Sequence, residues 1–303
     1  MIYTENIKKI LRNYENTNAG VKSNLGKLLM NGKLGGSGRL LILPVDQGHE
    51  HGPDKSFIIN PDAYDPLYHY NLAIEAGLSA YAAPLGFLEA GAETFAGQIP
   101  TILKINSSNS LIAIKNQSKN GTVKEALRLG CAAVGFTIYP GSEYQYEMIE
   151  EFKEISTEAT EYGLPSVLWS YPRGPEISKE SETSLNTIAY AAHIAALLGA
   201  HIIKVKPPTS VISDDSLKKN YNAKIDIKTL SCRIKHIKQC AFNSKKIVVF
   251  SGGNAKGDEE ILEEIRQIKD GGGNGSIIGR NTFQRPKKDA LNLLKNIIEI
   301  YNN

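Results

Sequence analysis

Short apolar segments rich in β-branched residues recur along this chain and alternate with longer segments of helical spacing. Eight segments have the composition of strands, at residues 40–45, 78–83, 101–105, 132–138, 166–170, 201–206, 247–250 and 276–279. Helical spacing is found between them, at residues 66–76, 122–129, 144–162, 183–198, 230–241 and 258–269. Because parallel strands need a crossover of about a dozen residues, this alternation predicts an α/β fold with a parallel sheet.

Eight such units can close into a (β/α)₈ TIM barrel or form an open, doubly wound sheet. No Gly-x-Gly-x-x-Gly follows residues 40–45 and no linker divides the chain, which favours the closed barrel. We expect the barrel to span residues 40–303 as one domain. Residues 1–39 are predicted to form an N-terminal helical extension, with a mobile loop at the entrance where glycines are frequent. The least regular link is 107–121, which mixes polar residues with a short apolar run.

Charge and cysteine content exclude several classes of protein. The net charge is only +3 and the basic residues are scattered, which argues against nucleic acid as a partner. The three cysteines match neither a disulfide framework nor a paired zinc site, as is typical of a reducing compartment. The first residues lack a signal-peptide core, and no apolar run approaches the roughly 20 residues that span a bilayer. We therefore expect a cytoplasmic protein with no membrane partner.

The segment HIIKVKPP carries two lysines at the end of the sixth predicted strand. Alternate residues of a strand face the same side, so Lys204 and Lys206 share one face, opposite Ile203 and Val205. The two prolines that follow end the strand. Both lysines therefore lie at or near its carboxyl end, where barrel enzymes place their active sites.

An unperturbed lysine has a pKa of about 10.4, so at neutral pH very few side chains carry the free amine that attacks a carbonyl. Desolvation and a second ammonium on the same face both lower that pKa, and the pair Lys204 and Lys206 offers both causes. The structural alternative is that either side chain extends to solvent. Lys104, in the segment TILKIN, also lies near a strand end and could instead pair with a carboxylate and position a substrate.

The first predicted strand ends in LILPVDQGHEHGP. Asp46 has the parity of Ile42, so its carboxylate could move protons at the carboxyl rim or cap a turn. His49 and His51 suggest a metal, but His-Glu-His in a loop lacks the spacing of a helical zinc motif. We therefore predict no metal site.

The fifth predicted strand, PSVLWSYPRG, puts Trp169 and Tyr171 on one face. Two aromatic rings can shape a pocket, and a phenol can act as an acid or a base, whereas core packing is the alternative for Trp169.

Glycine-rich turns follow the seventh and eighth predicted strands, in VVFSGGN and IIGRN. Glycine lets the backbone approach a phosphate, backbone amides can donate to it, and arginine adds a charged donor. These two positions hold phosphate in many barrels. The candidate phosphate-binding residues are therefore Ser251, Gly252, Gly253, Gly279 and Arg280.

In combination and in this order, the stretches VDQGHEHGP, ILKIN, VLWSYPRG, HIIKVK, VVFSGGN and IIGRN resemble the archaeal-type class I fructose-bisphosphate aldolases, a family that also has bacterial members. The resemblance implies reversible cleavage of fructose 1,6-bisphosphate to dihydroxyacetone phosphate and glyceraldehyde 3-phosphate, in glycolysis or gluconeogenesis. It also implies a catalytic barrel domain, no metal, no cofactor, a phosphorylated sugar as substrate, and a homo-oligomer.

The family's functional residues map onto this sequence position by position. The imine-forming lysine maps to Lys204, with Lys206 left open. The aspartate maps to Asp46 and the aromatic pair to Trp169 and Tyr171, with Tyr171 as proton donor or acceptor. The phosphate-binding positions fall on Ser251 to Gly253 and on Gly279 and Arg280.

One departure from the family concerns the residues after the lysines. Relatives with a Thr-Gly-Asp-like turn there differ from the PPTS of this chain, and residues 213–228 indicate an enlarged loop. The alternatives are a related Schiff-base aldolase or transaldolase acting on another phosphorylated ketose, a metal-dependent aldolase using His49 and His51, and a non-catalytic sugar-phosphate-binding barrel.

Overall fold

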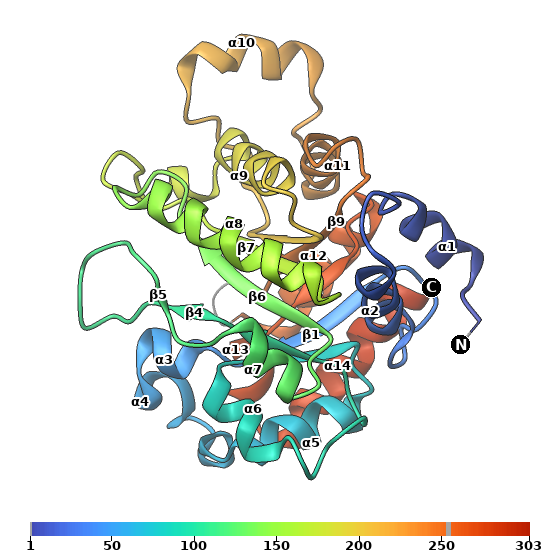
Figure 1. The fold of residues 1–303 in the computed structure, drawn as a ribbon. Helices are drawn as coiled ribbons and strands as arrows, with labels where there is room; N and C mark the ends of the chain where they lie inside the picture. The colour runs from blue at the N-terminus through green and yellow to red at the C-terminus, as the bar shows by residue number, and fades with distance from the viewer. Residues whose placement is uncertain (1, 253–255) are drawn as a thin grey trace.

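Eight parallel strands close into a barrel in the computed structural model, which describes residues 2–252 and 256–303. The strands follow one another around the barrel in the order β1-β10-β9-β8-β7-β6-β3-β2 (Figure 1). Their bounds are β1 Leu40–Pro44, β2 Ala80–Ala83, β3 Thr101–Lys104, β6 Ala133–Ile138, β7 Ser166–Ser170, β8 Ile202–Val205, β9 Ile247–Ser251 and β10 Gly275–Ile277. The predicted (β/α)₈ barrel is confirmed, and each predicted strand lies within two residues of an observed one.

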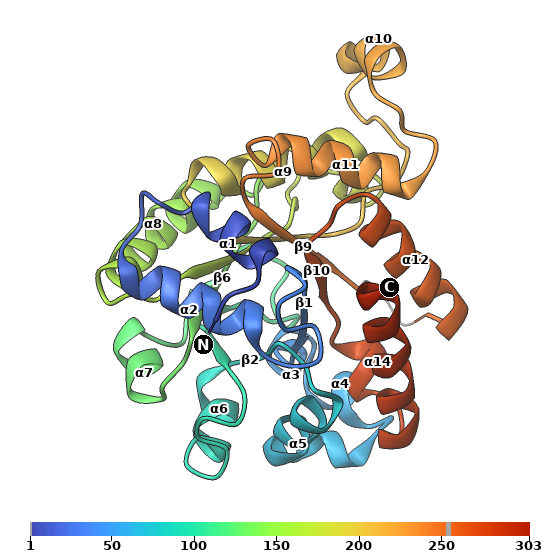
Figure 2. The same ribbon diagram turned by 90° about the vertical axis from the view of Figure 1, so that its right-hand side faces the viewer.

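Helices surround the strands on the outside of the barrel (Figures 1 and 2). They are α5 Pro66–Ala76, α6 Leu85–Gly91, α7 Val123–Arg128, α8 Gln145–Glu161, α9 Leu185–Leu197, α11 Leu230–Cys240, α12 Asp258–Asp270 and α14 Lys287–Asn302. The six predicted helices are confirmed, whereas α6 and α14 were not predicted. No helix in the described part of the chain is both long and apolar enough to cross a bilayer.

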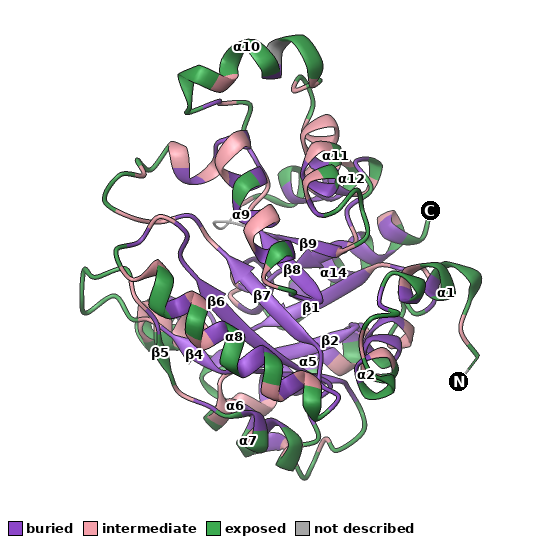
Figure 3. Ribbon diagram, turned by 45° about the horizontal axis from the view of Figure 1, so that its top comes forward, coloured by how far each residue is buried: buried purple, intermediate pink, exposed green. Residues whose placement is uncertain are grey.

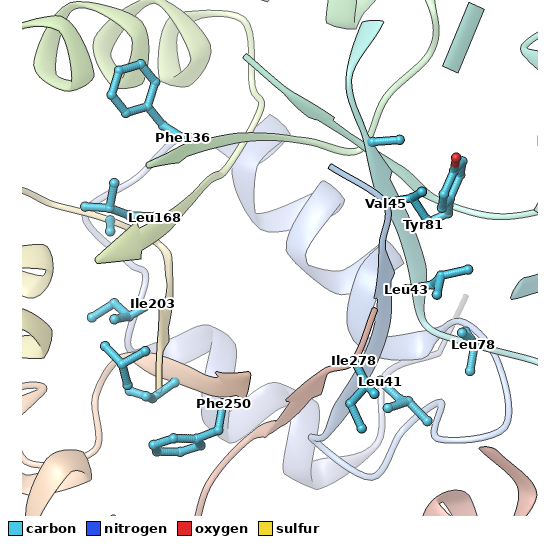
Figure 4. Close-up of a cluster of buried hydrophobic side chains, with 14 of the residues drawn as sticks. Leu41, Leu43, Val45, Leu78, Tyr81, Phe136, Leu168, Ile203, Phe250 and Ile278 are labelled. Carbon is cyan, nitrogen blue, oxygen red and sulfur yellow. The ribbon is translucent and has the colours of Figure 1, made fainter. Parts of the chain in front are cut away.

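Side chains along each strand alternate between the helices and the barrel interior. Figure 4 shows Leu43, Phe136, Leu168 and Phe250 pointing outward, where they join the large core between strands and helices. The residues of opposite parity form a second buried cluster inside the barrel, which includes Ile42, Ile102, Val167, Trp169, Ile202 and Val249. Lys204 has the parity of Ile202, so its side chain enters the interior.

Helices α1 Glu5–Arg12 and α2 Ala19–Met30 lie within the predicted helical extension. Their buried side chains, among them Ile7 and Leu25, belong to the same cluster as the barrel interior. The Tyr14 hydroxyl donates to the His201 carbonyl at 2.6 Å and accepts from the Ile247 N–H at 2.9 Å, where β8 and β9 begin. The extension therefore covers the amino end of the barrel. Residues 31–39 lead from α2 into β1 at this end, and the mobility expected of this loop stays a prediction.

Shorter elements lie in the connections between strands and helices. They are α3 Gln47–His51, α4 Pro53–Phe57, the 3₁₀ turns η1 Pro61–Tyr64 and η2 Ser181–Thr183, α13 Arg280–Phe283, and the antiparallel pair β4 Asn106–Ser107 and β5 Ser118–Lys119. The irregular link at 107–121 is thus a hairpin. The enlarged loop contains α10 Asp215–Lys224, which projects from the barrel and is mostly exposed (Figures 2 and 3).

Candidate active site

A cleft of about 500 Å³ opens at the carboxyl ends of the strands. Nine of the eleven residues predicted for the site line it, namely Asp46, Trp169, Tyr171, Lys204, Lys206, Ser251, Gly252, Gly279 and Arg280. Of the other two, Lys104 lines a smaller adjoining cavity and Gly253 lies outside the described residues. The structure therefore gathers most of the predicted residues, which lie at or just beyond the carboxyl ends of five strands, β1, β7, β8, β9 and β10, around one space.

Lys204 is buried in this cleft with only 5% of its surface exposed. Its Nζ lies 4.9 Å from the centre of the Trp169 ring and 5.6 Å from that of Tyr171. Within the described residues, no hydrogen bond or ion pair reaches this nitrogen. Burial lowers the pKa of Lys204 to about 8, against the opposing influence of the carboxylates of Asp46 and Glu50. A free amine is therefore accessible near neutral pH.

Trp169 fits beside Lys204 because its ring lies over a glycine of β6, Gly135. A Cβ atom on Gly135 would lie 2.7 Å from the indole ring of Trp169, closer than carbon atoms approach. Trp169 is itself buried, so its ring both packs inside the barrel and forms a wall of the cleft. Core packing and a role in the pocket are therefore compatible for this residue.

Lys206 has a different environment from Lys204, although both face the cleft. Its Nζ pairs with Glu182 Oε2 at 3.1 Å, and the side chain remains 25% exposed. Burial lowers its pKa while Glu182 raises it. The expectation that Lys206 lowers the pKa of Lys204 was wrong, since the positive groups that do so are Lys104 and Arg280. Lys206 instead forms an ion pair with Glu182, whose negative charge balances that of the ammonium.

Lys104 lies behind Trp169, with its Nζ 5.6 Å from the ring centre. Its amino group donates to the backbone oxygen of Asn106 and, at 2.9 Å, to Asn106 Oδ1. The considered pairing with a carboxylate is not seen, because these neutral oxygens take its place. Burial lowers the pKa of Lys104 to about 8. It lines a cavity of about 20 Å³, which is separated from the main cleft by side chains that line both, among them Trp169 and Tyr171.

Asp46 and Tyr171 follow β1 and β7, which lie on opposite sides of the barrel, and both side chains line the cleft. Asp46 begins α3, but its side chain makes no capping hydrogen bond, so the carboxylate is available to the cleft. Burial raises the pKa of Tyr171 well above its ordinary value, and the charges of Asp46 and Glu50 add to the effect. The phenol therefore stays protonated at neutral pH and can donate a proton.

The edge of the cleft next to β1 is formed where β10 and β9 end. Ser251, Gly252, Gly279 and Arg280 line it. A Cβ atom on Gly279 would lie 2.7 Å from the Pro44 oxygen, so only glycine lets β10 end this close to β1. The Gly252 N–H already donates to the Ile277 carbonyl at 3.2 Å, so this amide is not available to a ligand. The other polar groups at this edge are the Ser251 hydroxyl, which is hydrogen-bonded to Tyr171, and the Arg280 guanidinium.

His49 and His51 lie on the short helix α3, where a loop was expected. Two residues apart on a helix, they point in different directions. His49 Nδ1 is 3.3 Å from the Ser108 carbonyl, and His51 Nε2 is 3.8 Å from Glu50 Oε2. Within residues 2–252 and 256–303, no group of three His, Cys, Asp or Glu side chains is arranged to hold a metal ion.

Four charged residues of the cleft were not predicted: Glu50, Arg173, Lys179 and Glu182. Arg173 lies 4.9 Å from the Tyr139 ring centre and donates to the Tyr139 hydroxyl at 3.3 Å. Glu182 is buried and also accepts from Lys179 at 2.9 Å. Arg173 lies two residues after Tyr171, just beyond the end of β7, and this position is the one sequence feature that could have predicted it. The others come from loops whose positions depend on contacts distant in the sequence.

A closed parallel barrel with its polar side chains gathered at the carboxyl ends defines the class of (β/α)₈ barrel enzymes. Within that class, the chain belongs to the DeoC/LacD aldolase family, whose sequence profile matches residues 40–285.

Named relatives agree with this assignment. The chain is 37% identical over 265 residues to the fructose-bisphosphate aldolase class 1 of Thermoproteus tenax, covering 87% of this chain and 89% of the relative. It is 36% identical over 300 residues to a probable fructose-bisphosphate aldolase class 1 of Chlamydia muridarum, with 94% and 85% covered.

The fold is also that of a solved archaeal fructose-1,6-bisphosphate aldolase. That structure holds its catalytic lysine covalently bound to the carbinolamine intermediate of the substrate. The TM-score is 0.76 with 32% identity, over 91% of this chain and 98% of that one.

Proposed function

We propose that this protein is a class I fructose-bisphosphate aldolase, which cleaves fructose 1,6-bisphosphate reversibly to dihydroxyacetone phosphate and glyceraldehyde 3-phosphate. One observation carries the proposal: Lys204 presents a buried amino group, without an ion-pair partner in the described chain, between two aromatic rings and beside a carboxylate. Such an amine is the nucleophile that imine chemistry requires. The named relatives support the choice of substrate.

Lys204 is the imine-forming residue in this proposal and Lys206 is not. Lys206 is held charged by Glu182, whereas a nucleophile must be neutral. Lys204 has lost hydration without gaining a hydrogen-bonding partner, so its neutral form is the less costly one to bury.

The reaction follows from this arrangement. Neutral Lys204 adds to the C2 ketone, water leaves, and the protonated imine draws electrons from the bond between C3 and C4. Asp46 accepts the proton of the C4 hydroxyl as that bond breaks and the aldehyde is released. Tyr171, protonated because burial raises its pKa, donates its proton to C3 of the enamine. Asp46 then returns the proton that it accepted from the C4 hydroxyl to Tyr171. Water then hydrolyses the imine and restores the amine.

The remaining charged groups are assigned to the substrate's two phosphates. Ser251, Gly279 and Arg280 surround one phosphate in this proposal, with Gly252 providing close backbone approach, and the phosphate-binding role predicted for Gly253 lies outside the described residues. Lys206, Arg173 and Lys179 line the far side of the cleft, where a second phosphate would be received. Lys104 does not reach the substrate in this arrangement, and its charge lowers the pKa of Lys204.

Reductive trapping tests the proposal. Borohydride added with dihydroxyacetone phosphate should leave one covalent adduct, which mass spectrometry places on Lys204. Lys204→Met should form no adduct and lose activity by roughly a thousandfold or more. The matched control is Lys206→Met, which should still form the adduct on Lys204. Turnover without any adduct would refute the imine mechanism, and an adduct on Lys206 would refute the assignment.

Another phosphorylated ketose remains the second candidate substrate, raised by the unusual segment after Lys206. In the part of the chain that the structure describes, residues 213–228 do not line the cleft, so the enlarged loop gives no reason to prefer that candidate. Comparing kcat/KM for fructose 1,6-bisphosphate with those for other ketose phosphates decides between them.

The biological setting is proposed on the same basis. We place the enzyme in glycolysis or gluconeogenesis as a cytoplasmic homo-oligomer. Cys131, Cys232 and Cys240 are all free thiols, which is compatible with a reducing compartment. Cell fractionation with activity assays would contradict this location if the activity were found outside the cytoplasm.

A further inference from the structure

The side chain of Asn281 fixes both ends of the segment that joins β9 to α12. Its Nδ2 donates to the Gly252 carbonyl at 3.0 Å, and its Oδ1 accepts from the Lys256 N–H at 2.9 Å. A primary amide carries a donor and an acceptor, so one side chain can bind two backbone groups. Asn281 lies in α13 with 3% of its surface exposed, which makes these contacts hard for water to replace.

Arg285 supports the same arrangement from behind. Its Nε donates to the Asn281 carbonyl at 2.7 Å, its Nη2 donates to the Lys256 carbonyl at 3.0 Å, and its Nη1 pairs with Asp258 at the start of α12. The Lys256 ammonium pairs with Glu264 at 2.7 Å, so it is directed toward α12. The backbone of Lys256 is therefore held on both sides, by Asn281 and by Arg285.

These contacts lie directly at the edge of the cleft assigned to a phosphate. Gly252, Gly279, Arg280 and Asn281 all line that edge. Preset groups bind a charged ligand better than mobile ones, because no free energy is spent on ordering them at the moment of binding. A side chain that fixes the two backbone ends next to Arg280 would therefore act on phosphate affinity without touching the reacting carbon atoms.

We propose that Asn281 is a positioning residue for phosphate recognition: it holds the ends of the β9–α12 connection so that the cleft beside Arg280 keeps the shape that a phosphate ester needs. The proposal rests on the aldolase function proposed above. It predicts a defect confined to phosphorylated ligands, since the amine of Lys204 and its neighbours do not depend on Asn281.

The experiment compares two ketones that differ only in the phosphate, dihydroxyacetone phosphate and dihydroxyacetone. For each, borohydride trapping on Lys204 gives the concentration of ketone needed for half-maximal adduct. Asn281→Ala should raise this concentration roughly tenfold for the phosphate ester and leave that for dihydroxyacetone within about twofold. The KM for fructose 1,6-bisphosphate should rise in parallel, with kcat much less affected.

Two further variants keep the test decisive. Asn281→Asp retains the acceptor for the Lys256 N–H but loses the donor to Gly252, and it should show the same selective defect if Asn281→Ala does not fold. Asn274→Ala is the matched control, because the Asn274 amide also bridges backbone groups, accepting from Val248 at 3.0 Å and donating to Gly38 at 3.4 Å, at the other end of the barrel. It should not change the ratio between the two ketones.

The positioning role would be overturned if Asn281→Ala raised the half-maximal concentration equally for both ketones, or for neither. If the unmodified protein trapped neither ketone, the proposed function itself would fail, which is a different outcome from trapping both without discrimination by the variants.

Discussion

The three lysines near the cleft differ in what surrounds their amino groups. Lys104 donates to oxygens of Asn106, Lys206 pairs with Glu182, and Lys204 meets the faces of aromatic rings. The first two environments stabilise an ammonium by hydrogen bonds or by an opposite charge. The third offers it only the weaker attraction of a ring quadrupole. The protein therefore bears a cost in stability for keeping Lys204 buried.

That cost leads to a prediction for Lys204→Met. A fall in the pKa of Lys204 from 10.5 to about 8 corresponds to about 3 kcal/mol between its protonation states. Folded Lys204 binds its proton less tightly than the unfolded chain does. The unfavourable contribution is therefore fully present below about pH 8 and disappears as the pH rises through 10.5. Lys204→Met should raise the free energy of unfolding by about 1–3 kcal/mol at pH 7, measured by urea denaturation, and by less at pH 10.

Lys206→Met provides the contrast for this measurement. It removes one partner of the buried Glu182, so it should lower stability at pH 7 or leave it unchanged. A loss of stability in Lys204→Met at pH 7 would contradict the view that burial of this amine is unfavourable.

Residue parity is the reason why much of the site was predictable. Lys204, Trp169 and Asp46 are fixed on the inner face by strands whose alternation is legible in the sequence. Glu182 was not predictable, because its position depends on a 3₁₀ turn packed against the end of another strand. The positive charge that lowers the pKa of Lys204 was predicted wrongly for the same reason. It belongs in part to Lys104, which comes from a strand 100 residues earlier in the chain.

At the scale of elements, one buried tyrosine hydrogen-bonds the helical extension to two strands, in addition to the apolar contacts that the extension makes with the barrel interior. The Tyr14 hydroxyl satisfies the His201 carbonyl and the Ile247 N–H, both buried where β8 and β9 begin. An unsatisfied buried polar group costs more than the net gain from a hydrogen bond. Tyr14 therefore links residues 1–39 to the strand that carries Lys204.

Tyr14→Phe should lower the free energy of unfolding by about 1–3 kcal/mol in urea denaturation, because it leaves two backbone groups without a partner. The control is Tyr162→Phe, whose ring is 50% exposed, which should change stability by less than about 0.5 kcal/mol. Tyr14 lies at the end of the barrel opposite the cleft, so kcat should not fall with stability. Equal stability of the two variants would show that α1 and α2 are not coupled to the barrel in this way.

The elements that were predicted are those with a strong hydrophobic period. Helix α5 was found with its bounds Pro66–Ala76, because Asp65 caps its first turn and Gly77 ends it in a left-handed conformation. In helix α10 Tyr221 is buried and packs against His236 of α11, but most of its described side chains are exposed, and the strands β4 and β5 are two residues long, so neither leaves a clear period to detect. The division of the chain at residue 39, with the barrel as the catalytic domain, stays a prediction.

Among the described residues of the whole molecule, large apolar side chains are exposed in several places, including Ile58 and Ile59 after α4, the β4–β5 hairpin and α9. The tip of the β4–β5 hairpin carries Leu111, 96% exposed, beside the exposed Ile112 and Ile114, and the outer face of α9 carries Tyr190, 68% exposed, and Leu197. Scattered exposed leucines are ordinary, but grouped ones mark surfaces that bind other proteins. These two surfaces are therefore the candidates for contacts between subunits of the proposed homo-oligomer.

Light scattering after gel filtration should give a mass that is a multiple of 33.1 kDa. Replacing Leu111 and Ile112 together by serine, or Tyr190 by serine, removes apolar area of the kind that dominates interfaces. At least one of these changes should weaken association by roughly thirtyfold, the equivalent of about 2 kcal/mol. Asn109→Ser, on the same hairpin, should leave the mass unchanged. A single species at the mass of one chain would exclude the homo-oligomer, and unchanged assembly in both variants would place its interface elsewhere.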